Sequence, residues 1–133
     1  HFKEGYNCAE SILRAFNTVL DLKLSDDALR MGVGFGGGLG HAGCVCGALA
    51  ASVMVLGAVE GRMSRSQSLE PMYRLSQGFH SRFEDTFGGT CCRVLNPHPF
   101  NTKDHLRTCL KLTSNTAALL MNYMQENNLG KKL

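Results

Sequence analysis

The stretch GVGFGGGLGHAGCVCG, residues 32–47, decides how this chain folds, and it leads directly into the apolar segment ALAASVMVLGAV, residues 48–59. Eight of its sixteen residues are glycine, and Cys44 and Cys46 stand near its end. Glycine permits positive φ angles and close backbone approach at an entropic cost, so this density predicts a segment bent around another group. The apolar segment is well short of the roughly 20 residues that cross a bilayer, so it predicts a buried helix and no membrane span.

Helical periodicity extends outward from this stretch in both directions. The buried helix should begin near Cys46, and its small residues predict close packing at the centre of the molecule. Apolar residues spaced by three and four predict a helix over 2–20, with Cys8 on or beside its apolar face. Ser25 is a suitable N-cap for a short helix that should reach about Phe35.

The C-terminal half predicts two longer helices. One should run over 66–87, with Pro71 tolerated only in its first turns, and should end at Gly88 and Gly89. The segment Asn96-Pro97-His98-Pro99 predicts a loop, after which Asn101 or Thr102 should cap a last helix reaching about residue 127. Cys109 lies beside the apolar stripe of that helix.

These elements predict the fold class. No segment shows convincing period-two alternation, so we expect an all-α fold. The prediction is a compact single-domain bundle of about five helices over residues 1–133, with a glycine-rich loop before the central helix.

Charge and composition restrict the partners of the protein. The 14 Lys and Arg residues and 11 Asp and Glu residues are scattered, which predicts a solvated surface and no nucleic-acid binding. The small-residue helix and an exposed sulfur site would both suit a homodimer. No N-terminal signal is present in this chain, and cytoplasmic and exported locations both stay open.

The six cysteines are the residues most suggestive of chemistry, at positions 8, 44, 46, 91, 92 and 109. None forms a C-x-x-C pair, so the thioredoxin-like motif, the c-type haem attachment motif and paired zinc knuckles are absent from the sequence. Thiols that converge from distant elements can build a metal or redox centre on a rigid frame.

Local sequence suggests which cysteines are reactive. Cys46 should stand at a helix N-terminus, where the dipole favours a thiolate, and Arg93 could act likewise on Cys92. His41 could be a ligand or a proton relay, whereas His80 and His105 are expected on the surface. Glycines around the thiols could turn backbone N–H groups toward sulfur; they are Gly36, Gly37, Gly38, Gly40, Gly43 and Gly47.

Three segments together resemble a known family: GYNCAES at 5–11, CGALAA at 46–51 and FGGTCCRVL at 87–95. They are similar to the C_GCAxxG_C_C family of putative redox-active proteins, over nearly the whole chain. One departure is Ala51, where the family pattern has glycine. The resemblance implies four recurrent cysteines, with Cys44 and Cys91 as accessory thiols; the four are Cys8, Cys46, Cys92 and Cys109.

The resemblance also implies a cofactor. The family looks similar to a helical domain of split-Soret cytochromes that carries a non-haem iron centre, which implies that these cysteines can hold iron. The leading hypothesis is therefore an electron-transfer protein with an iron–sulfur cluster on the four recurrent cysteines, serving an unidentified redox partner.

Two alternatives stay open beside the cluster. One is a metal-free thiol–disulfide protein that uses Cys44 with Cys46, or Cys91 with Cys92. The other is a structural zinc module in which cysteines are joined by His41 or His98. The sequence leaves open whether the protein is an enzyme, because no catalytic triad or carboxylate pair is evident.

Overall fold

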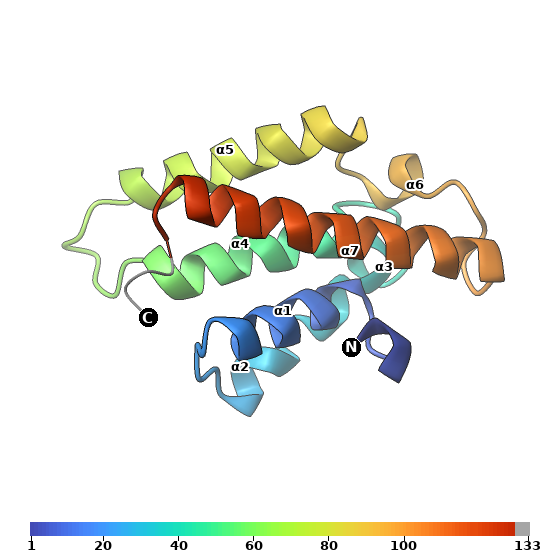
Figure 1. Ribbon diagram of the computed structural model, residues 1–133, viewed down its shortest axis with the longest axis horizontal. Coiled ribbons are helices and arrows are strands. Elements are labelled where there is room, and N and C mark those ends of the chain that lie inside the picture. Colours follow the sequence, from blue (N-terminus) through green and yellow to red (C-terminus); the bar gives the residue numbers. More distant parts are fainter. Residues whose placement is uncertain (130–133) are drawn as a thin grey trace.

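Helix α4, Gly47–Glu60, is the element against which the other long helices pack. In the computed structural model, which describes residues 1–129, α4 lies between α5 and α1 while α7 runs alongside (Figure 1). The described residues form helices, turns and loops with no strand, which confirms the all-α class. No helix among them is long and apolar enough to cross a membrane.

The core is built from one face of each long helix. Its fully buried large side chains each contribute on the order of 1.5–3 kcal/mol through burial, and include Ile12, Leu56, Phe79, Phe83 and Leu120. Ala51, at the position where the family pattern has glycine, is fully buried in α4. Gly47 and Ala48 are buried as well, so the small residues in the first half of α4 lie at the contacts with its neighbours, whereas Gly57 has no neighbour within 4 Å of its Cβ position.

The N-terminal segment differs from the single helix predicted over 2–20. It forms a short 3-10 helix, Phe2–Glu4, then turns at Gly5 with a φ of 101°, and continues as α1, Cys8–Val19. Asn7 and Glu10 form a capping box, in which the Asn7 side chain accepts from the Glu10 backbone N–H. This cap begins a new helix and places Cys8 in its first turn.

The segment between α1 and α4 is less helical than predicted. Ser25 caps α2, Asp26–Arg30, as expected, but α2 ends five residues before Phe35. A 3-10 turn, Val33–Phe35, and the single turn α3, Gly36–Leu39, follow it. Gly37 and Gly38 interrupt α3 with φ angles of 65° and 68°, and the chain then runs to α4.

The C-terminal half agrees with the prediction apart from one short helix and the start of the helix predicted over 66–87, which lies at Glu70. Helix α5 spans Glu70–Phe87, with Pro71 in its first turn and Gly88 as a left-handed C-cap. The short helix α6, Cys92–Leu95, was not predicted. Thr102 caps α7, Lys103–Glu126, and the start of α7 lies at the same end of the bundle as α3, α6 and the N-terminus (Figure 1).

Candidate functional site

Two cysteine-bearing loops lie side by side at this end of the bundle. The Cys46 N–H donates to the Thr90 carbonyl at 2.7 Å, and the Cys92 N–H donates to the Cys44 carbonyl at 2.6 Å. Val45 and Cys91 form an isolated antiparallel bridge between them. This pairing, here called the cysteine clip, joins segments 44–46 and 90–92 and fixes the starts of α4 and α6 relative to each other.

Arg93 fastens the clip from outside. Its backbone N–H and its Nε both donate to the Gly43 carbonyl, and its terminal nitrogen donates to the Ala42 carbonyl at 3.1 Å. The sequence suggested that Arg93 would favour a thiolate on Cys92. The pKa of Cys92 is instead raised, by burial and by the charges of Cys8 and Cys91, so the role of Arg93 here is to hold the loop.

Gly38 and Gly47 lie so close to neighbouring groups that a side chain does not fit at either position. A Cβ on Gly38 would lie 2.6 Å from the Cys44 nitrogen and 2.7 Å from the Cys92 Cβ, at a φ of 68°. A Cβ on Gly47 would lie 2.6 Å from the Cys8 sulfur and 2.7 Å from the Phe35 carbonyl oxygen. Side chains at these positions would push the clip and α1 away from α4.

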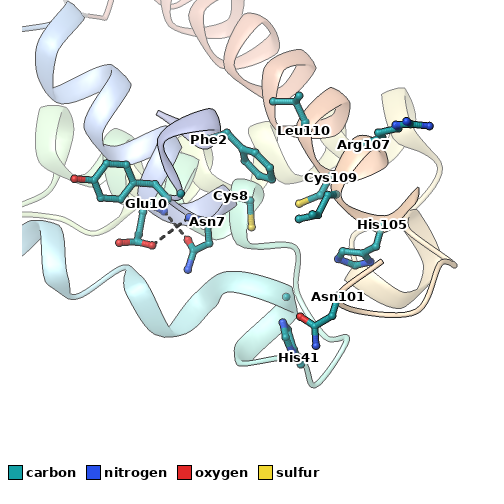
Figure 2. Close-up of a pocket in the computed structure, with 14 residues that line it drawn as sticks. Phe2, Asn7, Cys8, Glu10, His41, Asn101, His105, Arg107, Cys109 and Leu110 are labelled. Carbon is teal, nitrogen blue, oxygen red and sulfur yellow. Dashed lines mark hydrogen bonds between the residues drawn. The ribbon is translucent and has the colours of Figure 1, made fainter. Parts of the chain in front are cut away.

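Cys8 of α1 and Cys109 of α7 form a sulfur pair at the site. Figure 2 shows both sulfur atoms facing the space between the two helices. The hydrogen bond from Cys109 is the main cause that lowers the pKa of Cys8 to about 7, against the opposing effect of burial. The backbone N–H groups of Gly37 and Ala9 lower it further, so a glycine-loop amide acts on Cys8.

Cys109 behaves in the opposite way. The same interaction raises the pKa of Cys109, because ionisation would remove the proton that Cys109 donates to the Cys8 sulfur. Burial and the charges of Cys8 and Cys46 raise it further, while the Thr113 hydroxyl opposes them. Near neutral pH Cys8 is therefore the thiol that ionises and Cys109 the one that keeps its proton, so the ionised pair is a thiolate on Cys8 and a thiol on Cys109.

Cys46 stands at the N-cap of α4, as the sequence predicted, but it is not a preferred thiolate. Burial raises its pKa to about 11, and this outweighs the N–H groups of Leu49 and Ala48 at the helix start. The expectation of a thiolate at Cys46 was therefore wrong, because loss of hydration on burial destabilises the thiolate more than the N–H groups of the helix N-terminus stabilise it.

The remaining predicted residues lie around this centre. Cys44 is exposed and Cys91 is half-buried, and all six cysteines are free thiols. Gly36 packs on the Asn7 side chain, and Gly43 lies beneath Arg93. Gly40 is exposed and has no neighbour close to its Cβ position, so it ends α3 and does not contact the thiols.

The four recurrent cysteines are neighbours, but they do not form a finished metal site. Among residues 1–129, no three Cys, His, Asp or Glu side chains are arranged to hold a metal ion, and neither His41 nor His98 completes such a set. Four thiols suit soft metals chemically. As they stand, however, the sulfur atoms do not fit a shared cluster or zinc ion, and binding one would require them to move closer.

A cleft of about 590 Å³ opens beside the Cys8–Cys109 pair. Its walls come from the N-terminal segment, the glycine loop and the start of α7, as Figure 2 shows. The sequence analysis gave several of its residues no part in the site, among them Asn101, Arg107 and Leu110. Only their position near Cys109 in the chain could have indicated them.

His105 also lines this cleft, and its predicted surface position was wrong. It is buried, its Nδ1 donates to the His98 carbonyl at 3.1 Å, and its backbone carbonyl accepts from Asn96. His41 is exposed and stacks on Phe100, with ring centroids 4.1 Å apart, and Phe100 in turn packs on His105. These contacts hold the glycine loop against the loop that precedes α7.

Comparison with known proteins identifies the family of the chain. The family model described as "Putative redox-active protein (C_GCAxxG_C_C)" matches residues 6–123. An "uncharacterized protein" of Archaeoglobus fulgidus is 28% identical over 132 residues, which cover 92% of this chain and 87% of that one. No solved structure matches the chain significantly. The chain belongs to the C_GCAxxG_C_C family.

Proposed function

We propose that the protein is a thiol-based redox protein whose working pair is Cys8 and Cys109. The observation that carries this proposal is that the two sulfur atoms, one from α1 and one from α7, face each other beside an open cleft (Figure 2). Neither thiol pair suggested by the sequence is as well placed. In each of those pairs one thiol is more exposed than the other. Cys44 is exposed while Cys46 is buried, and Cys91 is half-buried while Cys92 is buried.

The chemistry follows from the ionised form of the pair. A thiolate is the nucleophile in thiol–disulfide exchange, and a pKa near ambient pH is close to optimal for the attacking thiol. Cys8 would attack an oxidised partner, and Cys109 would then displace that partner by attacking the Cys8 sulfur. The protein pair gives up two electrons and the one proton that it carries and becomes a disulfide, while the partner disulfide takes up the two electrons and is released as one thiolate and one thiol.

Oxidation and thiol counting test this proposal. Metal-free reduced protein should lose two titratable thiols on mild oxidation, and peptide mass spectrometry should locate the new bond between Cys8 and Cys109. Cys109→Ser should abolish this bond, whereas the matched change Cys44→Ser, at an exposed thiol, should leave it intact. A first disulfide between any other two cysteines would contradict the proposal.

A second candidate is an iron–sulfur cluster held by Cys8, Cys46, Cys92 and Cys109, with electron transfer as its activity. It is favoured by one observation: the charge of Cys8 acts on each of the other three thiols, so all four lie in one region. A cluster would supply one-electron exchange there. The sulfur atoms would have to close around it on binding.

Iron and acid-labile sulfide, measured together with a visible spectrum on protein purified without oxygen, decide between the two candidates. Stoichiometric iron and sulfide that disappear in Cys8→Ser and Cys92→Ser variants would favour the cluster. Metal-free protein that retains its helical content would favour the dithiol pair. A colourless protein containing zinc would instead support the structural alternative. The homodimer and the unidentified redox partner stay predictions, which light scattering and affinity capture would test.

A further inference from the structure

The Thr113 side chain of α7 is buried, and its hydroxyl oxygen has no hydrogen-bond partner among residues 1–129. Thr116, which lies in the same helix, does have one, because its hydroxyl donates to the Leu112 carbonyl at 2.7 Å. The corresponding acceptor for Thr113 would be the Cys109 carbonyl, and Thr113 does not use it. A buried hydroxyl without a partner is unfavourable, which points to a partner that forms in another state of the site.

The Cys109 sulfur is the acceptor closest to hand. Thr113 lies one helical turn after Cys109, so the two side chains share a face of α7. The hydroxyl lowers the pKa of Cys109, whereas burial and the Cys8 sulfur raise it. Thr113 also lines a cleft of about 430 Å³ that shares Phe2 and Leu110 with the cleft beside Cys109. The hydroxyl therefore has space in which to turn toward the sulfur.

The surroundings of Cys109 change once Cys8 has reacted. While Cys8 is a thiolate, its charge and its hydrogen bond raise the pKa of Cys109 and keep that thiol protonated. A mixed disulfide on Cys8 carries no charge, so both effects disappear. Burial is then the main obstacle to a thiolate on Cys109, and a hydrogen bond from a nearby donor would oppose it.

The other polar groups around Cys109 are less suited to donate this bond. The titratable and charged side chains that line the site come from α1, the start of α4, the glycine loop and α7; they are Cys8, Glu10, Cys46, His41, His105 and Arg107. Glu10 is an acceptor and closes the capping box of α1. The Nδ1 of His105 donates to a backbone carbonyl at 3.1 Å, and the Arg107 guanidinium points away from the Cys109 sulfur in Figure 2. Thr113 is thus the better-placed donor.

We propose that the Thr113 hydroxyl donates a hydrogen bond to the Cys109 thiolate in the second step of the exchange and so makes Cys109 the resolving nucleophile. The inference rests on the proposed thiol-based function and adds a residue to its second step. In that step the Cys109 proton passes to water in the cleft, from which a released partner thiolate takes it up. The Cys109 sulfur attacks the Cys8 sulfur, the bond between Cys8 and the partner sulfur breaks, and the partner leaves as a thiolate with the electron pair.

The two steps can be measured separately with 4,4′-dithiodipyridine, a neutral disulfide whose released thiopyridone is followed by absorbance. The reduced full chain carries Cys44→Ser and Cys91→Ser, which remove the exposed thiol and a half-buried thiol outside the proposed pair. The first thiopyridone released reports attack by Cys8, and the second reports displacement by Cys109. Peptide mass spectrometry identifies the resulting disulfide, and Cys109→Ser should abolish the second release.

Thr113→Val should leave the first release unchanged and slow the second about tenfold near pH 7, because a hydrogen bond to an ionised group has an effect of this order. The variant should need a pH about one unit higher to reach the same second rate. Its urea midpoint should stay equal or rise, since valine removes a buried hydroxyl that lacks a partner. A residue with only a structural role would instead lower the midpoint and leave the pH dependence of the second release unchanged.

Two comparisons separate the hydroxyl from the packing of the side chain. Thr113→Ser retains the hydroxyl and should keep most of the second rate, whereas Thr113→Ala, which lacks it, should be as slow as Thr113→Val. This pair decides the question even if valine disturbs the core. Thr116→Val is the matched control in the same helix, because the Thr116 hydroxyl is bonded to the Leu112 carbonyl, and it should leave both releases unchanged.

Failure of the inference differs from failure of the proposed function. If Thr113→Val gives the second release at an unchanged rate, or if Thr113→Ser and Thr113→Ala are equally slow, the dithiol function stands and the role of Thr113 is overturned. If Cys109→Ser still gives the second release, or if the first release does not come from Cys8, the proposed function itself fails and the inference fails with it.

Discussion

Replacing Gly47 by alanine should break the contact between α1 and α4 at the cysteine centre. The new Cβ would lie 2.6 Å from the Cys8 sulfur and 2.7 Å from the Phe35 carbonyl oxygen. Favourable separations are roughly 3.5–4.0 Å, so one or both neighbours must move by about 1 Å. The oxygen belongs to the backbone and cannot rotate away, and overpacking of this kind costs about 1–3 kcal/mol.

A second effect of Gly47→Ala opposes the first but is smaller. Alanine gains up to about 1 kcal/mol over glycine inside a helix, and less at the first helical position, which Gly47 occupies. We therefore expect a net loss of about 1–2 kcal/mol in the free energy of unfolding. The displaced Cys8 sulfur should also lose its hydrogen bond from Cys109, so the pKa of Cys8 should rise from about 7 toward its ordinary value.

Urea unfolding and alkylation of Cys8 with iodoacetamide as a function of pH measure the two effects. Gly57→Ala is the matched control in the same helix, because no atom lies within 4 Å of its Cβ position. That variant should gain about 0.5–1 kcal/mol and leave the alkylation profile unchanged. If Gly47→Ala is as stable as Gly57→Ala and keeps a Cys8 midpoint near pH 7, the argument from close approach is refuted.

Three further outcomes follow from the site. Alkylation of Cys8 in reduced, metal-free protein should be half-maximal near pH 7. Cys109→Ala should shift that midpoint upward, because it removes the group that lowers the pKa of Cys8 most. An unchanged midpoint would assign the low pKa to the backbone amides alone. The free energy of unfolding of reduced protein should rise by up to about 1 kcal/mol between pH 7 and about 8, where the folded state releases the Cys8 proton and the unfolded state does not. From about pH 9 upward it should fall, since the unfolded thiols ionise there while the raised pKa values of Cys46, Cys92 and Cys109 keep these thiols protonated in the folded state; urea midpoints across this range check both signs. Arg93→Ala should lower the free energy of unfolding by about 1 kcal/mol, because the loop carbonyls before the cysteine clip lose their side-chain donors. A melting temperature equal to that of the unchanged protein would argue against a role of Arg93 in holding this loop.

Local signals in the sequence were sufficient for much of the fold. The start of α4 after Cys46, the position of Pro71 in the first turn of α5 and the end of α5 at Gly88 are all fixed by residues within one helical turn. Capping by Ser25 and Thr102 is equally local, because each side chain accepts from a backbone N–H three residues later. Such features depend on backbone geometry that the residue type itself determines.

The break before α1 could also have been recognised. Asn7 followed three residues later by Glu10 is the sequence pattern of a capping box, and Gly5 supplies the left-handed turn before it. The apolar spacing across 2–20 concealed this signal, since the 3-10 turn keeps Phe2 packed against the core.

The arrangement of the thiols could not be predicted in the same way. The contact of Cys8 with Cys109 depends on the packing of α1 beside α7, and the cysteine clip depends on pairing across about 45 residues. The raised pKa of Cys46, where the sequence predicted a thiolate, has a similar origin. Its position at a helix start is visible in the sequence, but the depth of its burial is set by the whole bundle.

The distance in sequence between Cys8 and Cys109 has a consequence for how the protein must be made. Closing a loop of about 100 residues costs an unfolded chain roughly 1.5 kcal/mol more than closing the loop of about 18 residues between Cys91 and Cys109. Random oxidation of an unfolded chain should therefore favour short-range pairs over the proposed Cys8–Cys109 pair by roughly tenfold. Under the proposed function the thiols must therefore stay reduced until α7 has docked, and oxidation is productive only afterwards.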